Sequence, residues 1–261
     1  MKKRIISLLL AAAMLVTLMP AAFAAGTYSD TDGHWGEAAI DRWSSYGVIG
    51  GYDGNVFVPD GSMTRAEVAR VFVNLLGLKQ RTDISKYKDV APSAWYYDDI
   101  AKCVAAGILN GDGVAAMNPE TPVTREELFT MFACALGVAP KATANKQFID
   151  GNEVSSWAAG YVNALADMGV INGYGGVLSP GSDINRASVM TVLDNAIKTY
   201  VTTNGATVDA GDGIVLVVAD NVTVTGKVEN LVVADSGKTV TVNGGAVDSV
   251  TCLLYTSGHE L

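Results

Sequence analysis

The sequence predicts a mainly α-helical protein made of three helix-turn-helix repeats, followed by a short all-β segment that starts a β-solenoid or a β-sandwich. The first observation behind this prediction is a threefold repeat with a period of about sixty residues. The second is an abrupt change after Tyr200, where helical spacing gives way to alternating Val and Thr. Five landmark positions return in the same order in each copy: Asp30, Asp89 and Asp150; Trp35, Trp95 and Trp157; Gly47, Gly107 and Gly169; Pro59, Pro119 and Pro180; Arg65, Arg125 and Arg186. Small repeats bury their apolar faces mainly against one another, so we expect the copies to share one core.

The first helix of each copy is expected to begin at the recurring tryptophan. In the first copy Ile40 and Trp43 fall on one side of this helix, and Gly47 follows at its end. Such spacing is typical of an amphipathic helix, and glycine suits the left-handed residue that closes it. We interpret the recurring tryptophans as core anchors rather than as platforms for sugar rings.

A glycine-rich turn follows each first helix. It comprises residues 51–55 in the first copy, 111–113 in the second and 173–176 in the third, and such clusters make tight reversals. Tyr52 and Tyr174 lie on these turns and are our candidates for stacking against a ligand. No copy spaces its oxygen ligands as an EF-hand does, so we predict no metal site.

The second helix of each copy begins with a recognisable cap. Thr64 with Glu67 and Thr124 with Glu127 match a capping box, in which side chain and backbone cap each other reciprocally. In the third copy Asn185 and Ser188 stand at these positions, so a cap remains but the box does not.

The arginine inside each cap is not explained by capping. A cation in the first turn of a helix is mildly unfavourable, because the helix dipole is positive there. Two uses are open: an ion pair with a carboxylate of a neighbouring repeat, or capture of an external anion by the guanidinium together with free backbone amides.

The amino terminus reads as a secretory signal peptide covering residues 1–24. Three early basic residues precede an apolar run over residues 5–19, and Ala22-Phe23-Ala24 is a small-x-small cleavage pattern. Removing it takes away three of the 18 basic residues and none of the 27 acidic ones, which leaves a formal net charge near −12. That balance argues against nucleic acid or anionic lipid as partners, and we expect no membrane insertion after cleavage.

The residues over about 28–200 resemble the surface-layer homology (SLH) domain of exported bacterial proteins. The resemblance rests on an ordered pattern in the first copy, from Asp30 and Trp35 through Gly47-Val48-Ile49 to Thr64-Arg65-Ala66-Glu67. It implies a three-pronged pseudo-trimer with ligand grooves between neighbouring prongs. It also implies noncovalent binding of secondary cell-wall polymers, often carrying pyruvylated N-acetylmannosamine, and a location in the cell wall or surface layer, where self-association is a further expectation.

Carried over by position, the resemblance makes Arg65 and Arg125 the main candidates to bind the carboxylate of the ketal. Thr64, Glu67, Thr124 and Glu127 would shape the surrounding helix starts. Arg186 is a weaker candidate because its cap is altered, and Glu126 adds a negative charge in the second copy. We therefore expect the groove that uses Arg65 to be the best preserved.

The expected boundaries are residues 28–78, 87–138 and 148–200 for the repeats and 205–250 for the β-rich segment. Within that segment, residues 222–226 and 240–244 alternate with period two and lie 18 residues apart. We expect the segment to be truncated, and interpret residues 251–261 as a truncation or sequence-assembly remnant.

The function that follows is noncovalent anchoring to the cell wall, with no cofactor and no catalysis. The two histidines support neither a Ser-His-Asp triad nor a histidine-rich metal site, and no pair of carboxylates is singled out for glycoside hydrolysis. The alternatives are a targeting module of a larger surface enzyme or array protein, and a purely protein-binding helical module.

Overall fold

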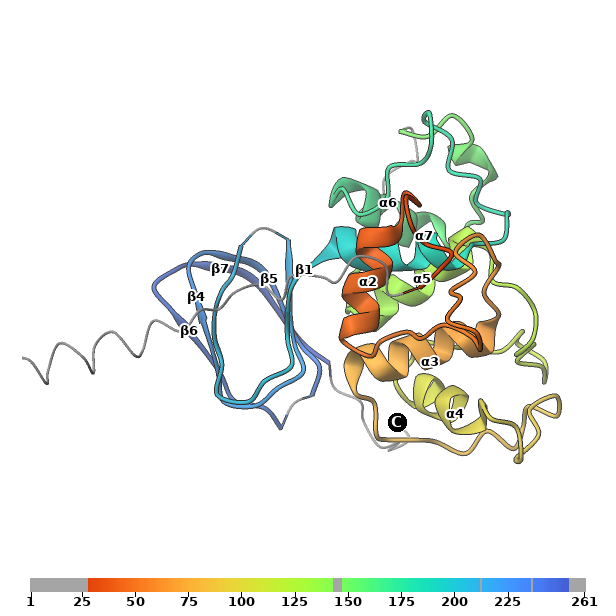
Figure 1. Ribbon diagram of the computed structural model, residues 1–261, viewed down its shortest axis with the longest axis horizontal. Coiled ribbons are helices and arrows are strands. Elements are labelled where there is room, and N and C mark those ends of the chain that lie inside the picture. Colours follow the sequence, from red (N-terminus) through yellow and green to blue (C-terminus); the bar gives the residue numbers. More distant parts are fainter. Residues whose placement is uncertain (1–27, 143–146, 212, 236, 254–261) are drawn as a thin grey trace, which may run out of the picture.

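A computed structural model describes residues 28–142, 147–211, 213–235 and 237–253. It shows a body of short helices beside a stack of parallel strands, which confirms the predicted layout (Figure 1). The predicted signal peptide and residues 254–261 of the tail lie outside the described residues.

Each repeat contributes two helices and a glycine-rich turn between them. The helices are α2 (Glu37–Ser45) and α3 (Arg65–Leu76), α4 (Tyr97–Ala105) and α5 (Arg125–Ala135), and α6 (Ala159–Asp167) and α7 (Arg186–Ala196). A 3₁₀ turn, Gly151–Glu153, precedes α6. Both predicted capping boxes form, and Asn185 caps α7 by accepting a hydrogen bond from the amide of Ser188 without a reciprocal partner. Within the part of the chain that the structure describes, no helix is long and apolar enough to cross a bilayer.

The recurring tryptophans are not core anchors, so that interpretation was wrong. Trp35, Trp95 and Trp157 are 61%, 51% and 52% exposed. The reason is local: each first helix begins two residues after its tryptophan, and the residue between them turns inward instead. Tyr96 and Ala158 are buried at that position, and a Cβ atom on Gly36 would meet Ala187.

The three repeats close into a ring around a short triangle of backbone hydrogen bonds. The amide of Met63 donates to the carbonyl of Ile184, that of Ile184 to Val123, and that of Val123 to Met63, at 3.1, 2.9 and 2.9 Å. All three side chains are almost fully buried. Because each repeat both donates and accepts, the contacts run head to tail and close, as a cyclic arrangement requires.

The β-rich segment is a β-solenoid, the first of the two predicted alternatives. Its strands are β1 (Ile197–Val201), β2 (Thr207–Asp209), β3 (Ile214–Val217), β4 (Val222–Thr225), β5 (Val228–Val233), β6 (Val240–Asn243) and β7 (Val247–Cys252). They form two all-parallel sheets, in the orders β1-β3-β5-β7 and β2-β4-β6. Val222 pairs with Val240, so the 18-residue interval seen in the sequence is one coil of the solenoid.

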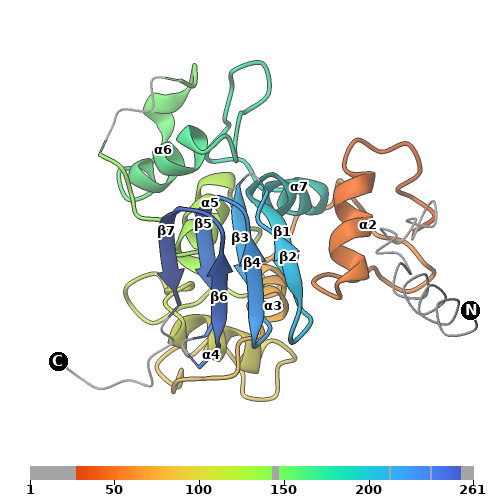
Figure 2. The same cartoon turned by 90° about the vertical axis from the view of Figure 1, so that its left-hand side faces the viewer.

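The four-stranded sheet lies between two hydrophobic cores. Figure 2 shows it behind β4 and β6, with helices of the repeats on its far side. In β3, Ile214 and Leu216 pack into the core of the helical repeats, while Val215 and Val217 pack into the core of the solenoid. Burial on both faces explains why β3 is a continuous apolar run, whereas β4 alternates.

Helix α7 passes directly into strand β1. The helix ends at Ala196, and Ile197 opens the first strand. Arg42 in α2 caps the junction: its Nη1 atom donates to Asp194 at 2.6 Å, and its Nη2 atom donates to the carbonyls of Ile197 and Lys198. These bonds satisfy the carbonyl of the C-cap residue Ile197, which a helix end leaves free, and that of Lys198 in the first strand.

Candidate functional site: grooves between the repeats

Each recurring arginine reaches from its own repeat into the next one. The Nε atoms of Arg65, Arg125 and Arg186 donate to the carbonyls of Met117, Leu178 and Phe57, at 2.9, 2.7 and 2.8 Å. Arg186 belongs to the third repeat and Phe57 to the first, so the series closes on itself. The arginines therefore hold neighbouring repeats together, whether or not they also bind a ligand.

The recurring aspartates hold the same three peptides from the other side. The carboxylate of Asp30 accepts hydrogen bonds from the amides of Phe57 and Val58, both at 2.7 Å. Asp89 and Asp150 make the equivalent bonds in the second and third repeats. Val58 has a φ of 59°, a left-handed conformation that disfavours a β-branched residue, so these bonds stabilise a strained turn.

The environment lowers the pKa of two of these carboxyls. Burial by itself would raise the pKa of Asp30, but the amides of Phe57 and Val58 and the charge of Arg186 favour the ionised form and outweigh it. For Asp150, burial is likewise outweighed, here by two amide hydrogen bonds and the charge of Arg125, so its pKa also falls. Burial lowers the pKa of Arg125, and the charge of Asp150 opposes that change.

The amides at the helix starts are already occupied, which removes one element of the predicted anion site. In α3 the amides of Arg65 and Ala66 donate to the carbonyls of Thr121 and Pro119 in the next repeat, and the amide of Glu67 donates to Thr64. The same bonds recur at α5 and α7. Any anion must therefore be held by the guanidinium groups and by groove side chains, not by these amides.

Three grooves follow the three junctions, and we name each by its arginine. The Arg65 groove has a cavity of about 330 Å³. The Arg125 groove has a cavity of about 720 Å³. At the third junction, which we call the Arg186 groove, the guanidinium of Arg186 lies 4.7 Å from the ring centre of Tyr52. Each groove combines an arginine from one repeat with the turn of the next repeat.

The Arg65 groove has two carboxylates in its lining. Asp112 and Glu127 line the cavity, and Glu127 pairs with the Nη1 atom of Arg65 at 3.4 Å. The Nη2 atom donates to the carbonyl of Asn110 at 2.8 Å. The ion-pair use of the arginine is therefore observed here, and Trp157 from the third repeat lines the same cavity.

The Arg125 groove has the largest volume of the three cavities described, and apart from Arg125 its lining is aliphatic, aromatic and neutral polar. Trp35 and Tyr174 line it, and Tyr174 is 93% exposed. Over the described residues, Arg125 donates a hydrogen bond from Nε alone, while its guanidinium lies 5.4 Å from the ring centre of Phe129. Its terminal nitrogens therefore remain available to an acceptor in the groove.

The Arg186 groove is closed by its own side chains. Arg186 is only 4% exposed, and its Nη2 atom donates to the carbonyl of Gly50. Its Nη1 atom donates to the hydroxyl of Tyr52, which in turn donates to Glu67 at 2.9 Å. Trp95 is the counterpart in the second repeat of Trp35 and Trp157, and the guanidinium of Arg70 lies 4.5 Å from its ring centre.

Most of the residues predicted from sequence lie at the junctions between repeats, but they are distributed over three separate grooves. Thr64 and Thr124 serve as caps, and the other candidates are divided among the three grooves. Sequence reasoning missed Trp35 and Trp157 as groove residues. Their signal was present, because each stands just before a helix and returns at a fixed position.

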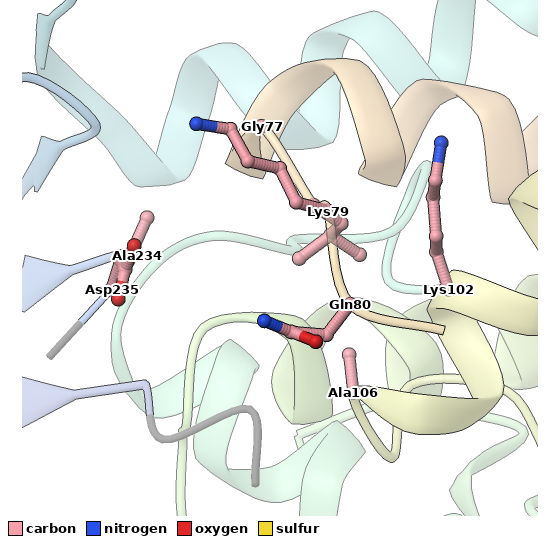
Figure 3. A pocket seen from close by; sticks show the side chains of 8 residues that line it. Gly77, Lys79, Gln80, Lys102, Ala106, Ala234 and Asp235 are labelled. Carbon is pink, nitrogen blue, oxygen red and sulfur yellow. The ribbon is translucent and has the colours of Figure 1, made fainter. Parts of the chain in front are cut away.

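A smaller cavity of about 220 Å³ lies between the end of α3 and the turn after β5. Figure 3 shows Lys79, Gln80 and Lys102 on its helical side and Asp235 on the solenoid side. None of the predicted site residues lines it.

Helical repeats closed head to tail, with an arginine across each junction, define a cyclic three-repeat module. The model of the S-layer homology domain matches residues 27–69, 86–129 and 147–190, about half of the chain. The chain therefore belongs to the S-layer homology domain family. Family membership and the related surface-layer proteins indicate a secreted protein of the cell wall or surface layer.

Several curated proteins are similar over the same region. The amylopullulanase of Thermoanaerobacterium thermosulfurigenes is 29% identical over 175 residues, which cover 64% of this chain and 9% of that protein. The surface-layer 125 kDa protein of Lysinibacillus sphaericus is 29% identical, covering 83% of this chain and 17% of that protein. S-layer protein EA1 of Bacillus anthracis is 27% identical, covering 76% and 23%. The chain thus spans less than a quarter of the length of these relatives.

Proposed function

We propose that the three repeats anchor the chain to the cell wall by binding an acidic secondary wall polymer in the grooves between repeats. The pyruvylated glycan implied by the sequence resemblance fits this chemistry, since its ketal carboxylate can pair with a guanidinium while its sugar rings pack on aromatic side chains. The repeats bind in this way without catalysing a reaction.

The Arg125 groove is the observation that carries this proposal. It combines a cavity of about 720 Å³ with a guanidinium whose terminal nitrogens are free within the described structure. Trp35 and Tyr174 supply exposed rings at its edge. A cavity with an apolar lining and a few convergent polar groups is the usual form of a ligand site.

Sedimentation with purified cell walls tests the proposal. The chain without its signal peptide is expected to pellet with intact walls and to remain in solution once the secondary polymer has been removed chemically. Pelleting that survives removal of the polymer would contradict the proposal and favour a protein-binding module.

A paired variant separates groove chemistry from general charge. Arg65→Ala together with Arg125→Ala is expected to abolish pelleting. Both side chains also join repeats, so circular dichroism must show that the helices remain. Arg81→Ala is the matched control, because Arg81 is an exposed cation that pairs with Asp98 and lines neither described groove cavity.

A second candidate is a targeting module within a larger protein. The relatives favour it, because they include both an amylopullulanase and surface-layer proteins, and the match covers a small part of each. The complete reading frame distinguishes the two forms: a downstream catalytic domain indicates a surface enzyme, and further Val-Thr-Gly coils indicate an array protein.

A further inference from the structure

The arginine and the glutamate of one helix start serve different grooves. Arg65 reaches forward to the second repeat, and the carboxylate that meets it there is Glu127, which belongs to the helix start of the second repeat. In the same way, Glu67 of the first repeat contacts Tyr52, which binds Arg186 of the third repeat. Each arginine is therefore paired with the capping position of the following repeat.

This relationship changes the meaning of the altered cap in the third repeat. By the same geometry, the position that faces Arg125 is residue 188, and it is occupied by Ser188 instead of glutamate. The substitution thus removes a carboxylate from the Arg125 groove and leaves the surroundings of Arg186 unchanged. From the sequence alone, we had assigned its effect to Arg186.

The charge of each groove lining follows directly. Asp112 and Glu127 line the Arg65 cavity, and Glu127 pairs with its arginine, whereas none of the described residues that line the Arg125 cavity is a carboxylate. Asp150 lies close to Arg125, but Asp30 and Asp89 hold the equivalent positions in the other repeats, so it does not distinguish the grooves. The Arg125 groove therefore has the most favourable lining for a negatively charged ligand.

We infer that the Arg125 groove is the principal site for an acidic sugar in this chain, and that Ser188 determines this by leaving the guanidinium without a carboxylate partner. The inference rests on the proposed function and refines it. The expected order of affinity is the Arg125 groove first, then the Arg65 groove, then the closed Arg186 groove. This order differs from the expectation that the Arg65 groove is the best preserved.

Ser188→Glu tests the inference without weakening the fold. With Asn185 as the cap, a glutamate at position 188 can complete a capping box, so the helix start should be at least as stable. Its carboxylate should pair with Arg125 as Glu127 pairs with Arg65. Binding of purified wall polymer, measured by calorimetry, is expected to weaken by roughly tenfold or more.

Ser188→Gln is the matched control. Glutamine caps in the same way and has nearly the same size, but it carries no charge. Affinity within about threefold of the unaltered chain is expected for this variant. If Ser188→Glu and Ser188→Gln bind equally, the inference is overturned, whether both retain or both lose affinity.

Two further measurements complete the test. If Ser188→Glu does not fold, Glu127→Gln takes its place. This variant removes the carboxylate that pairs with Arg65 and should strengthen binding by about threefold. An unchanged affinity would overturn the role of the carboxylate.

Polymer stripped of its ketal groups by mild acid should bind the unaltered chain and Ser188→Glu equally weakly. If the unaltered chain does not bind intact polymer, the proposed function fails as well; if it binds and Ser188→Glu binds equally, only the inference fails.

Discussion

Arg186 donates a hydrogen bond from Nε to the carbonyl oxygen of Phe57 at 2.8 Å, although 129 residues separate them along the chain. This contact joins the third repeat to the first and completes the ring. Arg186 is 4% exposed, and its guanidinium also lies 4.4 Å from the ring centre of Phe57. The buried guanidinium of Arg186 is held by carbonyl groups and aromatic side chains. It therefore stabilises the cyclic arrangement of the repeats and is not available to bind a ligand.

Arg186→Ala is therefore expected to destabilise the protein. It leaves the buried carbonyl of Phe57 and that of Gly50 without this donor, at a cost of roughly 2–4 kcal/mol in the free energy of unfolding. Urea denaturation followed by circular dichroism measures it. Arg81→Ala is the control, since its pair with Asp98 is exposed and should contribute less than about 1 kcal/mol. Equal effects of the two variants would refute the role assigned to Arg186.

Acid should weaken the turn that Asp30 holds. The pKa of Asp30 in the folded protein lies below the ordinary value of 3.8, so its contribution to stability is complete above that value. This contribution is lost as the pH falls through the lowered pKa of Asp30 in the folded protein. The protonated carboxyl group no longer carries the negative charge that strengthens its hydrogen bonds with the two amides. Asp150 contributes in the same direction.

Asp30→Asn isolates this contribution. At about pH 7 the variant should be less stable than the unaltered chain by about 1 kcal/mol, and the difference should shrink at about pH 3. Chemical denaturation at both pH values measures it, with Asp53→Asn in the exposed turn as a control that should change little. A difference that stays constant with pH would count against ionisation as the cause.

The repeat architecture could be predicted from sequence because its signals are local. The caps at Thr64 and Thr124 and the glycines at helix ends depend on a few adjacent residues, and each was found where expected. The assignment of residues to grooves could not be predicted in this way. It depends on contacts between repeats, such as that of Arg65 with Glu127, and spacing along the chain does not show which copy faces which.

The exposure of the recurring tryptophans also could not be predicted from the sequence. Periodicity placed Trp35 at a helix start, but whether it points inward depends on where the first turn begins, and helix boundaries are uncertain by a residue or two. The helix begins at Glu37, two residues later than predicted, and the Trp35 ring lies on the surface instead of in the core.

Tyr200 links the first strand of the solenoid to the first repeat. Its hydroxyl donates to the carbonyl of Leu75 at 2.7 Å, and its ring packs on Trp43. Burial, with a smaller contribution from Tyr46, raises the pKa of Tyr200 to about 12. The folded state thus favours the neutral phenol, and this stabilisation is present below the ordinary value of 10.0 and is lost as the pH rises through about 12.

Tyr200→Phe should lower the free energy of unfolding by about 1 kcal/mol, because it removes one hydrogen bond and keeps the ring. Thermal denaturation measures the change. The stability of the variant should also fall less at alkaline pH than that of the unaltered chain. Tyr174→Phe is the control, since Tyr174 is 93% exposed. If both variants melt together with the unaltered chain, the hydroxyl does not couple the solenoid to the repeats.

Two equivalent tryptophans should differ in their effect on wall binding. Trp35 lines the Arg125 groove, whereas the ring of Trp95 is covered by Arg70, whose guanidinium is held by Asp99 at 2.8 Å. Trp35→Ala removes an open platform beside a free guanidinium and should weaken binding of purified wall polymer by roughly threefold to tenfold. Trp95→Ala removes a ring of similar exposure that lines neither described groove cavity, and it should leave affinity within about twofold. Both rings lie outside the core, so neither change should unfold the repeats, and calorimetric titration reports binding directly. A larger loss for Trp95→Ala than for Trp35→Ala would mean that the polymer binds mainly outside the Arg125 groove, and the choice of that groove as the principal site would be wrong.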